Sequence, residues 1–370
     1  MKITDVICQI IRLESIEGKT AGTQDTVIIR VQTDEGIEGI GECDASPEIC
    51  EAIINAPFSH NIACGLKELI IGEDPMCTTK VWDKMYKGCF YYGRRAVAIA
   101  TMAGIDMALW DIKGKALNQP IHALLGGKQH DNFRAYASIL FGSDGAETKD
   151  IGQRWVDYGY TAVKFGWEPM GESEAMDMEL VSSAREALGP DRELLIDAGC
   201  VWDARTALKR AHSFSEYNIG WLEEPLNQDD LEGYVWLRDR SPVPIAAGEG
   251  ECGRTAFNPW IDQRALDIYQ VDLARCGFTD SMHIGKRVQD VHAKMVNHCY
   301  KTPISVAACL HWLSTFKEAF LFEDCVEDSP LRHDLAEEKY QAVDGFITVP
   351  DKPGLGITLN EDLINKYKVN

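Results

Sequence analysis

The chain has 370 residues, of which 45% are hydrophobic and 26% are charged, and its formal net charge is −21. This length suits a barrel with a smaller second domain better than a single small core. The negative charge argues against a nucleic-acid partner, because nucleic-acid affinity comes from neutralising phosphates. The N-terminal apolar stretch is broken by Gln9 and Arg12, and no uncharged apolar run in the sequence is long enough to span a membrane. We therefore expect a soluble, cytoplasmic protein with no membrane partner.

The first part of the chain predicts a small α+β domain. Residues 26–43 contain two β-rich runs around a Thr-Asp-Glu-Gly turn, which is typical of a hairpin. Helical periodicity with many small residues follows over 79–117. The glycine-containing segment 124–132 then indicates a helix end and a linker. We place this capping domain at residues 1–127.

The pattern changes near residue 132 to short apolar strands that alternate with amphipathic helices. Eight strand candidates follow in order: FRAYAS, YTAVKF, ELLID, IGWLEE, VPIAAGE, DIYQVD, AKMVNH and EAFLFE. Ser173 is the expected cap of one intervening helix. This alternation predicts a parallel sheet, and eight units predict an α/β fold with a modified (β/α)8-type, TIM-like barrel over 128–344. Two β-like runs in the tail, 345–370, are expected to return to the capping domain.

Seven of the eight strand candidates end on a group that can carry out chemistry. In chain order these groups are Lys164, Asp197, Glu223, Glu249, Asp272, His298 and Glu323. The carboxyl ends of the strands in such a barrel meet at one rim, where the active site is built. A buried charge must be paired or bound to a metal. Chance explains one acid at a strand end, but not six acid or histidine groups in phase with the fold.

Three consecutive carboxylates predict a metal site. Asp197, Glu223 and Glu249 end neighbouring strands, with no cysteine or histidine among them. Hard oxygen ligands suit Mg²⁺, whereas zinc sites usually contain His or Cys.

The next two groups, Asp272 and His298, predict an acid–base pair, since an aspartate on one ring nitrogen fixes the tautomer and raises the basicity of the other.

These residues resemble the enolase superfamily, mandelate racemase subgroup. The resemblance covers nearly the whole chain and rests on VKF, LLIDAG, WLEEPL, AAGEGE, QVDLAR and VNH in that order. It implies Mg²⁺ on Asp197, Glu223 and Glu249, a His298–Asp272 dyad, and Glu323 as a carboxylic acid, with Asp324 and Glu327 as close competitors. A protonated Glu323 and Lys164 would then hydrogen-bond the substrate. It further implies abstraction of the proton α to a carboxylate by a His or Lys base, with Mg²⁺ stabilising the resulting ene-diolate. The resemblance also implies a symmetric homo-oligomer.

The sequence departs from the subgroup at one position. Many members have Lys-x-Lys on the second strand, and the second lysine is the base; here Lys164 is followed by Gly166. A second base for racemisation is therefore missing, and a single base, His298, suffices for dehydration. The resemblance then implies an acid-sugar dehydratase that forms a 2-keto-3-deoxy acid. Lys164 is interpreted as a cation that binds the substrate carboxylate or enolate, and a lysine that neutralises Asp197 and Glu223 is also compatible with the pattern.

Other functions remain open at this point. A sugar-lactone cycloisomerase also needs one base, an epimerase would need a second base from elsewhere, and a non-catalytic binding protein would not need the polar strand ends. Substrate choice is expected from two loops of the capping domain, residues 14–25 and 43–51. Four further residues follow polar strand ends and either line the pocket or pack in the core: Trp167, Trp202, Glu251 and Arg275.

Overall fold

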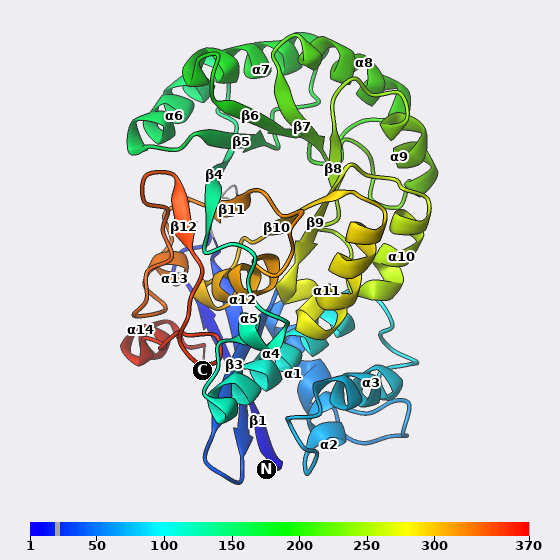
Figure 1. Ribbon diagram of the computed structural model, residues 1–370, viewed down its shortest axis with the longest axis vertical. Coiled ribbons are helices and arrows are strands. Elements are labelled where there is room, and N and C mark those ends of the chain that lie inside the picture. Colours follow the sequence, from blue (N-terminus) through cyan, green and yellow to red (C-terminus); the bar gives the residue numbers. More distant parts are fainter. Residues whose placement is uncertain (19–22, 370) are drawn as a thin grey trace.

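The computed structural model describes residues 1–18 and 23–369. Its N-terminal domain begins with a three-stranded antiparallel sheet in the order β1 (Ile3–Arg12), β2 (Asp25–Thr33) and β3 (Glu38–Cys43). The expected hairpin is present, with Val27 opposite Cys43. Five helices cover one side of this sheet or extend from it (Figure 1): α1 (Pro47–Asn55), α2 (Leu66–Ile70), α3 (Thr78–Gly88), α4 (Val97–Leu117) and α5 (Ile121–Leu124).

Helix α4 packs directly on β3 because two strand residues lack side chains. A Cβ atom at Gly39 would lie 2.0 Å from the carbonyl oxygen of Ala108, and one at Gly41 would lie 2.0 Å from that of Gly104. Only glycine therefore permits this approach. The capping domain has its own hydrophobic core, in which strand residues such as Ile29 pack with helix residues such as Ile105.

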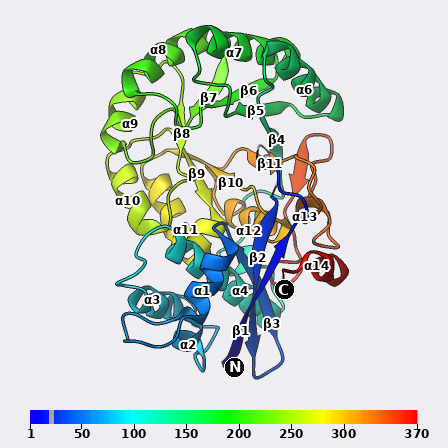
Figure 2. The same cartoon turned by 180° about the vertical axis from the view of Figure 1, so that it is seen from behind.

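Eight parallel strands form the second domain, and the predicted barrel is confirmed. They are β4 (Asn132–Leu140), β5 (Ala162–Gly166), β6 (Glu193–Asp197), β7 (Ile219–Glu223), β8 (Ile245–Ala247), β9 (Ile268–Asp272), β10 (Lys294–His298) and β11 (Phe322–Cys325). Sequential strands pair in parallel from β4 to β10, and β11 pairs with β4. The curled sheet and its outer arc of helices are seen in Figures 1 and 2.

The connecting helices are α6 (Gly145–Tyr158), α7 (Glu174–Leu188), α8 (Ala204–Ser215), α9 (Leu231–Arg238), α10 (Arg254–Asp262), α11 (Leu273–Asp290) and α12 (Pro303–Leu313). Ser173 caps α7 as expected, since its side chain accepts a hydrogen bond from the Met176 N–H at 3.2 Å. From β5 to β11 the chain thus reaches each strand from a helix of the outer layer.

The sheet closes between β10 and β11 without a regular ladder. Met295 forms an isolated bridge with Ala319. The Asn297 side chain then spans the two strands, because its amide donates to the Glu323 carbonyl (3.3 Å) and accepts from the Glu323 N–H (2.9 Å). Strand β11 begins at Phe322, later than the sequence predicted, because the chain is still in a turn at Ala319, whose N–H donates to the Phe316 carbonyl.

The C-terminal tail differs in part from its expected course. After β11 comes the short helix α13 (Pro330–His333) in place of a full eighth barrel helix, so the repeat ends on a strand. Strand β12 (Phe346–Thr348) pairs antiparallel with β4 and so lies on the barrel, not on the capping domain. The rest of the tail returns to the capping domain: the Leu355 N–H donates to Asp111 of α4 at 2.9 Å, helix α14 (Glu361–Tyr367) contacts β1, and Lys368 forms a bridge with Ile11.

One buried carboxylate joins the two domains. Glu42 of β3 accepts hydrogen bonds from the backbone N–H groups of Thr302 (3.1 Å) and Ser305 (2.9 Å), at the N-terminus of barrel helix α12. Its other oxygen accepts from the Thr26 hydroxyl at 3.0 Å. Orphan N–H groups and a positive helix end make this a favourable place for a carboxylate.

Among the helices of the described residues, none has both the length and the hydropathy of a bilayer-spanning segment.

Candidate active site

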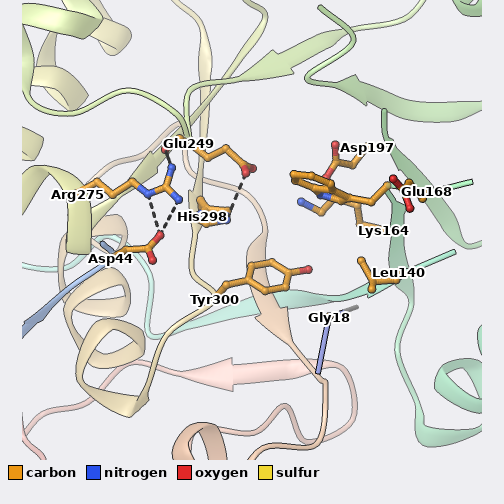
Figure 3. Close-up of a pocket in the computed structure, with 11 residues that line it drawn as sticks. Gly18, Asp44, Leu140, Lys164, Glu168, Asp197, Glu249, Arg275, His298 and Tyr300 are labelled. Carbon is orange, nitrogen blue, oxygen red and sulfur yellow. Dashed lines mark hydrogen bonds and ion pairs between the residues drawn. The ribbon is translucent and has the colours of Figure 1, made fainter. Parts of the chain in front are cut away.

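A cavity of about 490 Å³ opens at the carboxyl ends of the barrel strands, under the edge of the capping domain. Its lining combines both domains (Figure 3), and the lining residues are Gly18, Asp44, Leu140, Lys164, Trp167, Glu168, Asp197, Glu249, Arg275, His298 and Tyr300. Four of the seven predicted strand-end groups are in this list. Gly18 and Asp44 belong to the two predicted specificity loops, of which residues 19–22 lie outside the described part of the chain.

Lys164 points into the barrel from β5 and lies between two carboxylates. Its ammonium contacts the Glu223 carboxylate and lies 2.8 Å from Oε1 of Glu323, and all three side chains are almost completely buried. Burial alone would lower the pKa of Lys164, but Glu223 and Glu323 outweigh it and raise the pKa well above its usual value. These contacts favour the charged form of Lys164, in agreement with its interpretation as a cation.

The three predicted metal ligands are buried at neighbouring strand ends. Asp197 and Glu223 lie side by side in the register of β6 and β7, whereas Glu249 lies two residues beyond β8, on the loop that follows. Burial raises the pKa of each of these carboxyl groups to about 7, and repulsion from neighbouring acids adds to the effect. Lys164 opposes the rise in all three. One lysine thus leaves excess negative charge in this part of the site.

This excess charge fits a bound cation. Glu224, next in sequence to Glu223, is also buried with a pKa raised to about 7, again through burial and the neighbouring carboxylates. A cluster of buried acids that raise one another's pKa is stabilised when a divalent cation binds. The donor set is made of oxygen alone, which suits Mg²⁺. The residues present therefore fit the metal that the sequence predicted.

Asp272 and His298 form a directly hydrogen-bonded pair. They lie opposite each other in the register of β9 and β10, and the His298 Nδ1 is 2.6 Å from Oδ2 of Asp272. Oδ1 of Asp272 accepts from the Ala274 N–H at 2.6 Å, which fixes the carboxylate. The other ring nitrogen, Nε2, lies 3.6 Å from Oε1 of Glu249. Burial lowers the pKa of His298, but Glu249 and Asp272 outweigh it and raise the pKa well above its usual value.

A different trio of potential ligands also lies close together, namely Asp44, Asp272 and His298, with ligand atoms within 4.8 Å of one another. It differs from the predicted metal set, and its charges are already matched. Asp272 holds His298, while Arg275 lies 2.7 Å and Lys301 3.5 Å from the Asp44 carboxylate. Burial raises the pKa of Asp44, but these cations outweigh it and hold the pKa below its usual value. The trio is an extension of the dyad, not a second site for a cation.

The contacts of Glu323 favour its carboxylate form, whereas the resemblance implied a protonated acid. It accepts from the Ser138 hydroxyl (3.0 Å) and from the Cys299 N–H (2.8 Å), in addition to its contact with Lys164. Burial raises its pKa, but Lys164 and His298 outweigh this and lower it. Its competitor Asp324 forms an ion pair with Arg332 (2.7 Å) and so faces away from the site.

Tyr300 lines the cavity and was missed from the sequence. Its ring stacks on His298 with centroids 5.4 Å apart and planes 20° apart, and its hydroxyl contacts that of Ser138, which donates to Glu323. Figure 3 shows the phenol between His298 and Lys164. Tyr300 lies just past the end of β10, two residues after His298, and this closeness in sequence to a predicted site residue was the available signal.

Of the four residues that the sequence placed either in the pocket lining or in the core, two line the cavity and two do not. Trp167 and Arg275 line the cavity. Trp202 instead packs on Phe214, with ring centroids 6.1 Å apart, and Glu251 is absent from the cavity lining. Trp167 has a positive φ of 68°, a conformation that is uncommon for a bulky residue and that holds its backbone at the turn after β5.

A capped parallel barrel with acids and a His–Asp pair at its strand ends defines a member of the enolase superfamily. Two family profiles match the chain: "Enolase C-terminal domain-like" over residues 147–363 and "Mandelate racemase / muconate lactonizing enzyme, N-terminal domain" over residues 6–126. The chain belongs to the mandelate racemase / muconate lactonizing enzyme family, which confirms the resemblance found in the sequence.

Curated relatives and solved structures are similar along the whole chain. The D-galactarolactone cycloisomerase of Agrobacterium fabrum is 30% identical over 93% of this chain and 91% of its own, and the arabinonate dehydratase of Saccharolobus solfataricus is 31% identical over 96% and 93%. The structure of 3,6-anhydro-D-galactonate cycloisomerase from Zobellia galactanivorans has a TM-score of 0.90 and 27% identity, covering 100% of both chains.

Proposed function

We propose that this protein is a Mg²⁺-dependent acid-sugar dehydratase. It removes the proton α to a carboxylate and eliminates the β-hydroxyl as water, and the resulting enol tautomerises to a 2-keto-3-deoxy acid. The observation that carries the proposal is a site with one base. His298 lies on one side of the cavity, and Gly166 stands where the resemblance implies a second base, at a position where an added Cβ atom would crowd Asp197.

The lack of space at Gly166 is a matter of contact distances. A Cβ atom there would lie 2.9 Å from both Cβ and Oδ2 of Asp197, closer than such atoms approach in proteins. Any base at this position would therefore displace Asp197. Racemisation and epimerisation need a proton acceptor on each side of the α-carbon, so both are disfavoured.

The chain's own residues account for the steps of an elimination. Asp272 holds Nδ1 of His298, so that Nε2 takes the α-proton and Asp272 stabilises the imidazolium that results. The imidazolium then gives this proton to the departing β-hydroxyl. Lys164, fixed by Glu223 and Glu323, supplies positive charge to the developing enolate. A Mg²⁺ ion on Asp197, Glu223 and Glu249 would add positive charge at the substrate carboxylate.

A sugar-lactone cycloisomerase is the second candidate, since it also needs one base and since two of the similar proteins are named cycloisomerases. Proton NMR in D₂O with Mg²⁺, across a panel of four- to six-carbon sugar acids and their lactones, separates the two. New 2-keto-3-deoxy signals are the expected result. Isomerisation of a lactone without loss of water would overturn the dehydratase proposal. The homo-oligomeric state and the cytoplasmic location remain predictions from the sequence.

Mg²⁺ is expected to raise the melting temperature of the protein, because a cation at about 100 times its Kd stabilises a folded state by about 2.7 kcal/mol. Differential scanning fluorimetry with increasing Mg²⁺ measures this. Asp197→Asn should reduce the shift, while Asp191→Asn, an exposed acid just before the same strand, should leave it intact. An equal shift in the Asp197 variant would remove this residue from the ligand set.

Gly166→Ala is expected to weaken Mg²⁺ binding by about tenfold, the effect typical of disturbing a residue that positions a metal ligand. The added methyl group must push on Asp197, which it would otherwise approach to 2.9 Å. A Mg²⁺ titration followed by melting temperature gives the apparent affinity. Unchanged affinity and activity would show that the site can accommodate a side chain here, and the argument against a second base would lose its support.

A further inference from the structure

We propose that Asp44 and Arg275 bind a hydroxyl-bearing, uncharged end of the substrate, so that this protein acts on aldonic acids, with one carboxylate, and discriminates against aldaric acids, with two. The inference rests on the proposed function, because it names the substrate class of the same site. It concerns the end of the cavity away from Lys164, where Figure 3 shows Arg275 and Asp44 on the opposite side of His298 and Tyr300.

The two side chains form a closed ion pair between the domains. Nε and Nη2 of Arg275 lie 2.8 and 2.7 Å from Oδ2 of Asp44, and Nη1 donates to the carbonyl of Glu249. The backbone N–H of Asp44 donates to the Ala274 carbonyl at 3.1 Å, which holds the loop against the barrel. The pair is thus fixed at its base, and both side chains still line the cavity.

The guanidinium charge at this end is already matched. Arg275 has its counter-charge in Asp44. The nearby Lys301 is buried, lies 3.5 Å from Oδ1 of Asp44 and 3.2 Å from the Asp25 carbonyl, and is not among the cavity-lining residues. A second substrate carboxylate arriving here would meet an arginine that is already neutralised and an aspartate of its own sign.

A hydroxyl group suits this pair better than a carboxylate does. A guanidinium has five N–H donors, so donors remain on Arg275 beyond those used by Asp44 and Glu249, and the Asp44 carboxylate offers acceptor positions beside them. A sugar hydroxyl both donates and accepts, and so can bind both partners at once. A carboxylate only accepts, and placing it against Asp44 adds the repulsion that makes like-charge contacts unfavourable in binding sites.

The test compares substrates that differ only at the far end. Each pentonate and hexonate is assayed against the aldarate of the same configuration, with Mg²⁺, by the appearance of 2-keto-3-deoxy product. For the preferred configuration we expect kcat/KM for the aldonate to exceed that for the aldarate by about 100-fold. A preference for the aldarate would overturn the inference while the dehydratase proposal stands.

Asp44→Asn tests whether Asp44 causes the discrimination. An amide removes the negative charge but can still accept from Arg275, so the aldonate-to-aldarate ratio of kcat/KM should fall by about tenfold or more, whatever the change in absolute rate. The matched control is Glu48→Gln in the first turn of the adjacent helix α1, an exposed acid whose Oε1 lies 2.6 Å from Nη2 of Arg12 and which does not line the cavity. That variant should keep the wild-type ratio. A folded Asp44 variant with an unchanged ratio would overturn the assignment to Asp44.

Ligand-induced shifts in melting temperature separate the two proposals. If no acid is turned over but the aldonate still stabilises the wild-type protein more than its aldarate does, the dehydratase proposal fails and the inference holds. Equal stabilisation by both acids, or none by either, would overturn the inference. These wild-type measurements decide the matter even if the Asp44 variant fails to fold.

Discussion

Replacing His298 by Asn is expected to lower kcat by roughly 10²–10⁴-fold, the contribution typical of a general base. The asparagine amide can still donate to Asp272, which His298 Nδ1 approaches to 2.6 Å, but it has no nitrogen that accepts a proton. Steady-state assays of the dehydration measure the loss. The Mg²⁺-dependent rise in melting temperature should persist, since His298 is not among the three carboxylate ligands.

The exposed His283 of α11 provides the matched control, because His283→Asn changes the same residue type outside the cavity. This variant should keep wild-type activity. Full activity in the His298 variant would exclude the dyad as the source of the base. Loss of activity together with loss of the Mg²⁺ effect would instead show that His298 supports the metal site.

Lys164→Met is expected to impair both catalysis and stability. The substitution keeps the length of the side chain but leaves Glu223 and Glu323, both fully buried, without their shared cation. Removing one partner of a buried ion pair destabilises a protein by about 3–5 kcal/mol. Chemical denaturation measures this loss, and it should be smaller with Mg²⁺ present, because a divalent cation would neutralise Glu223, one of the two carboxylates.

The activity of this variant distinguishes the two interpretations of Lys164. If the lysine stabilises the enolate, activity at saturating Mg²⁺ stays low even after stability is regained. Activity that recovers in parallel with metal binding would mean that Lys164 only neutralises the acids around it. Lys113→Met is the control, since that lysine lies over the ring of Trp110, 4.8 Å from its centroid, and does not line the cavity.

The parts of the site that could be predicted are those that follow from local periodicity. The candidate strand ELLID has the same bounds as β6, and the adjacency of Asp272 and His298 follows from two consecutive strands of one parallel sheet. In such a sheet the strands run in the same direction, so the last residue of each strand reaches the same rim. Strand-end residues are therefore brought together by the fold itself, and a single sequence contains that information.

The parts that could not be predicted depend on contacts between distant segments. The Asp44–Arg275 pair joins residues 231 positions apart and depends on how the capping domain is seated on the barrel. The charge state of Glu323 depends on Lys164, which approaches it from another strand. Strand β12 pairs with the first residues of β4, which precede those that pair with β5 and β11, and this is a fact of the assembled fold and not of the tail.

The position of Glu42 has a consequence for how such proteins can diversify. Its carboxylate is completely buried, and its acceptors are matched to the N-terminus of a helix in the other domain. If the capping domain were exchanged between two distant relatives, the incoming cap would need a carboxylate at this position. The recipient barrel would need a helix N-terminus that can donate to it. Recombination at the boundary is thereby restricted to compatible halves, and new specificities arise more readily by changing the loops at the cavity edge than by exchanging the cap.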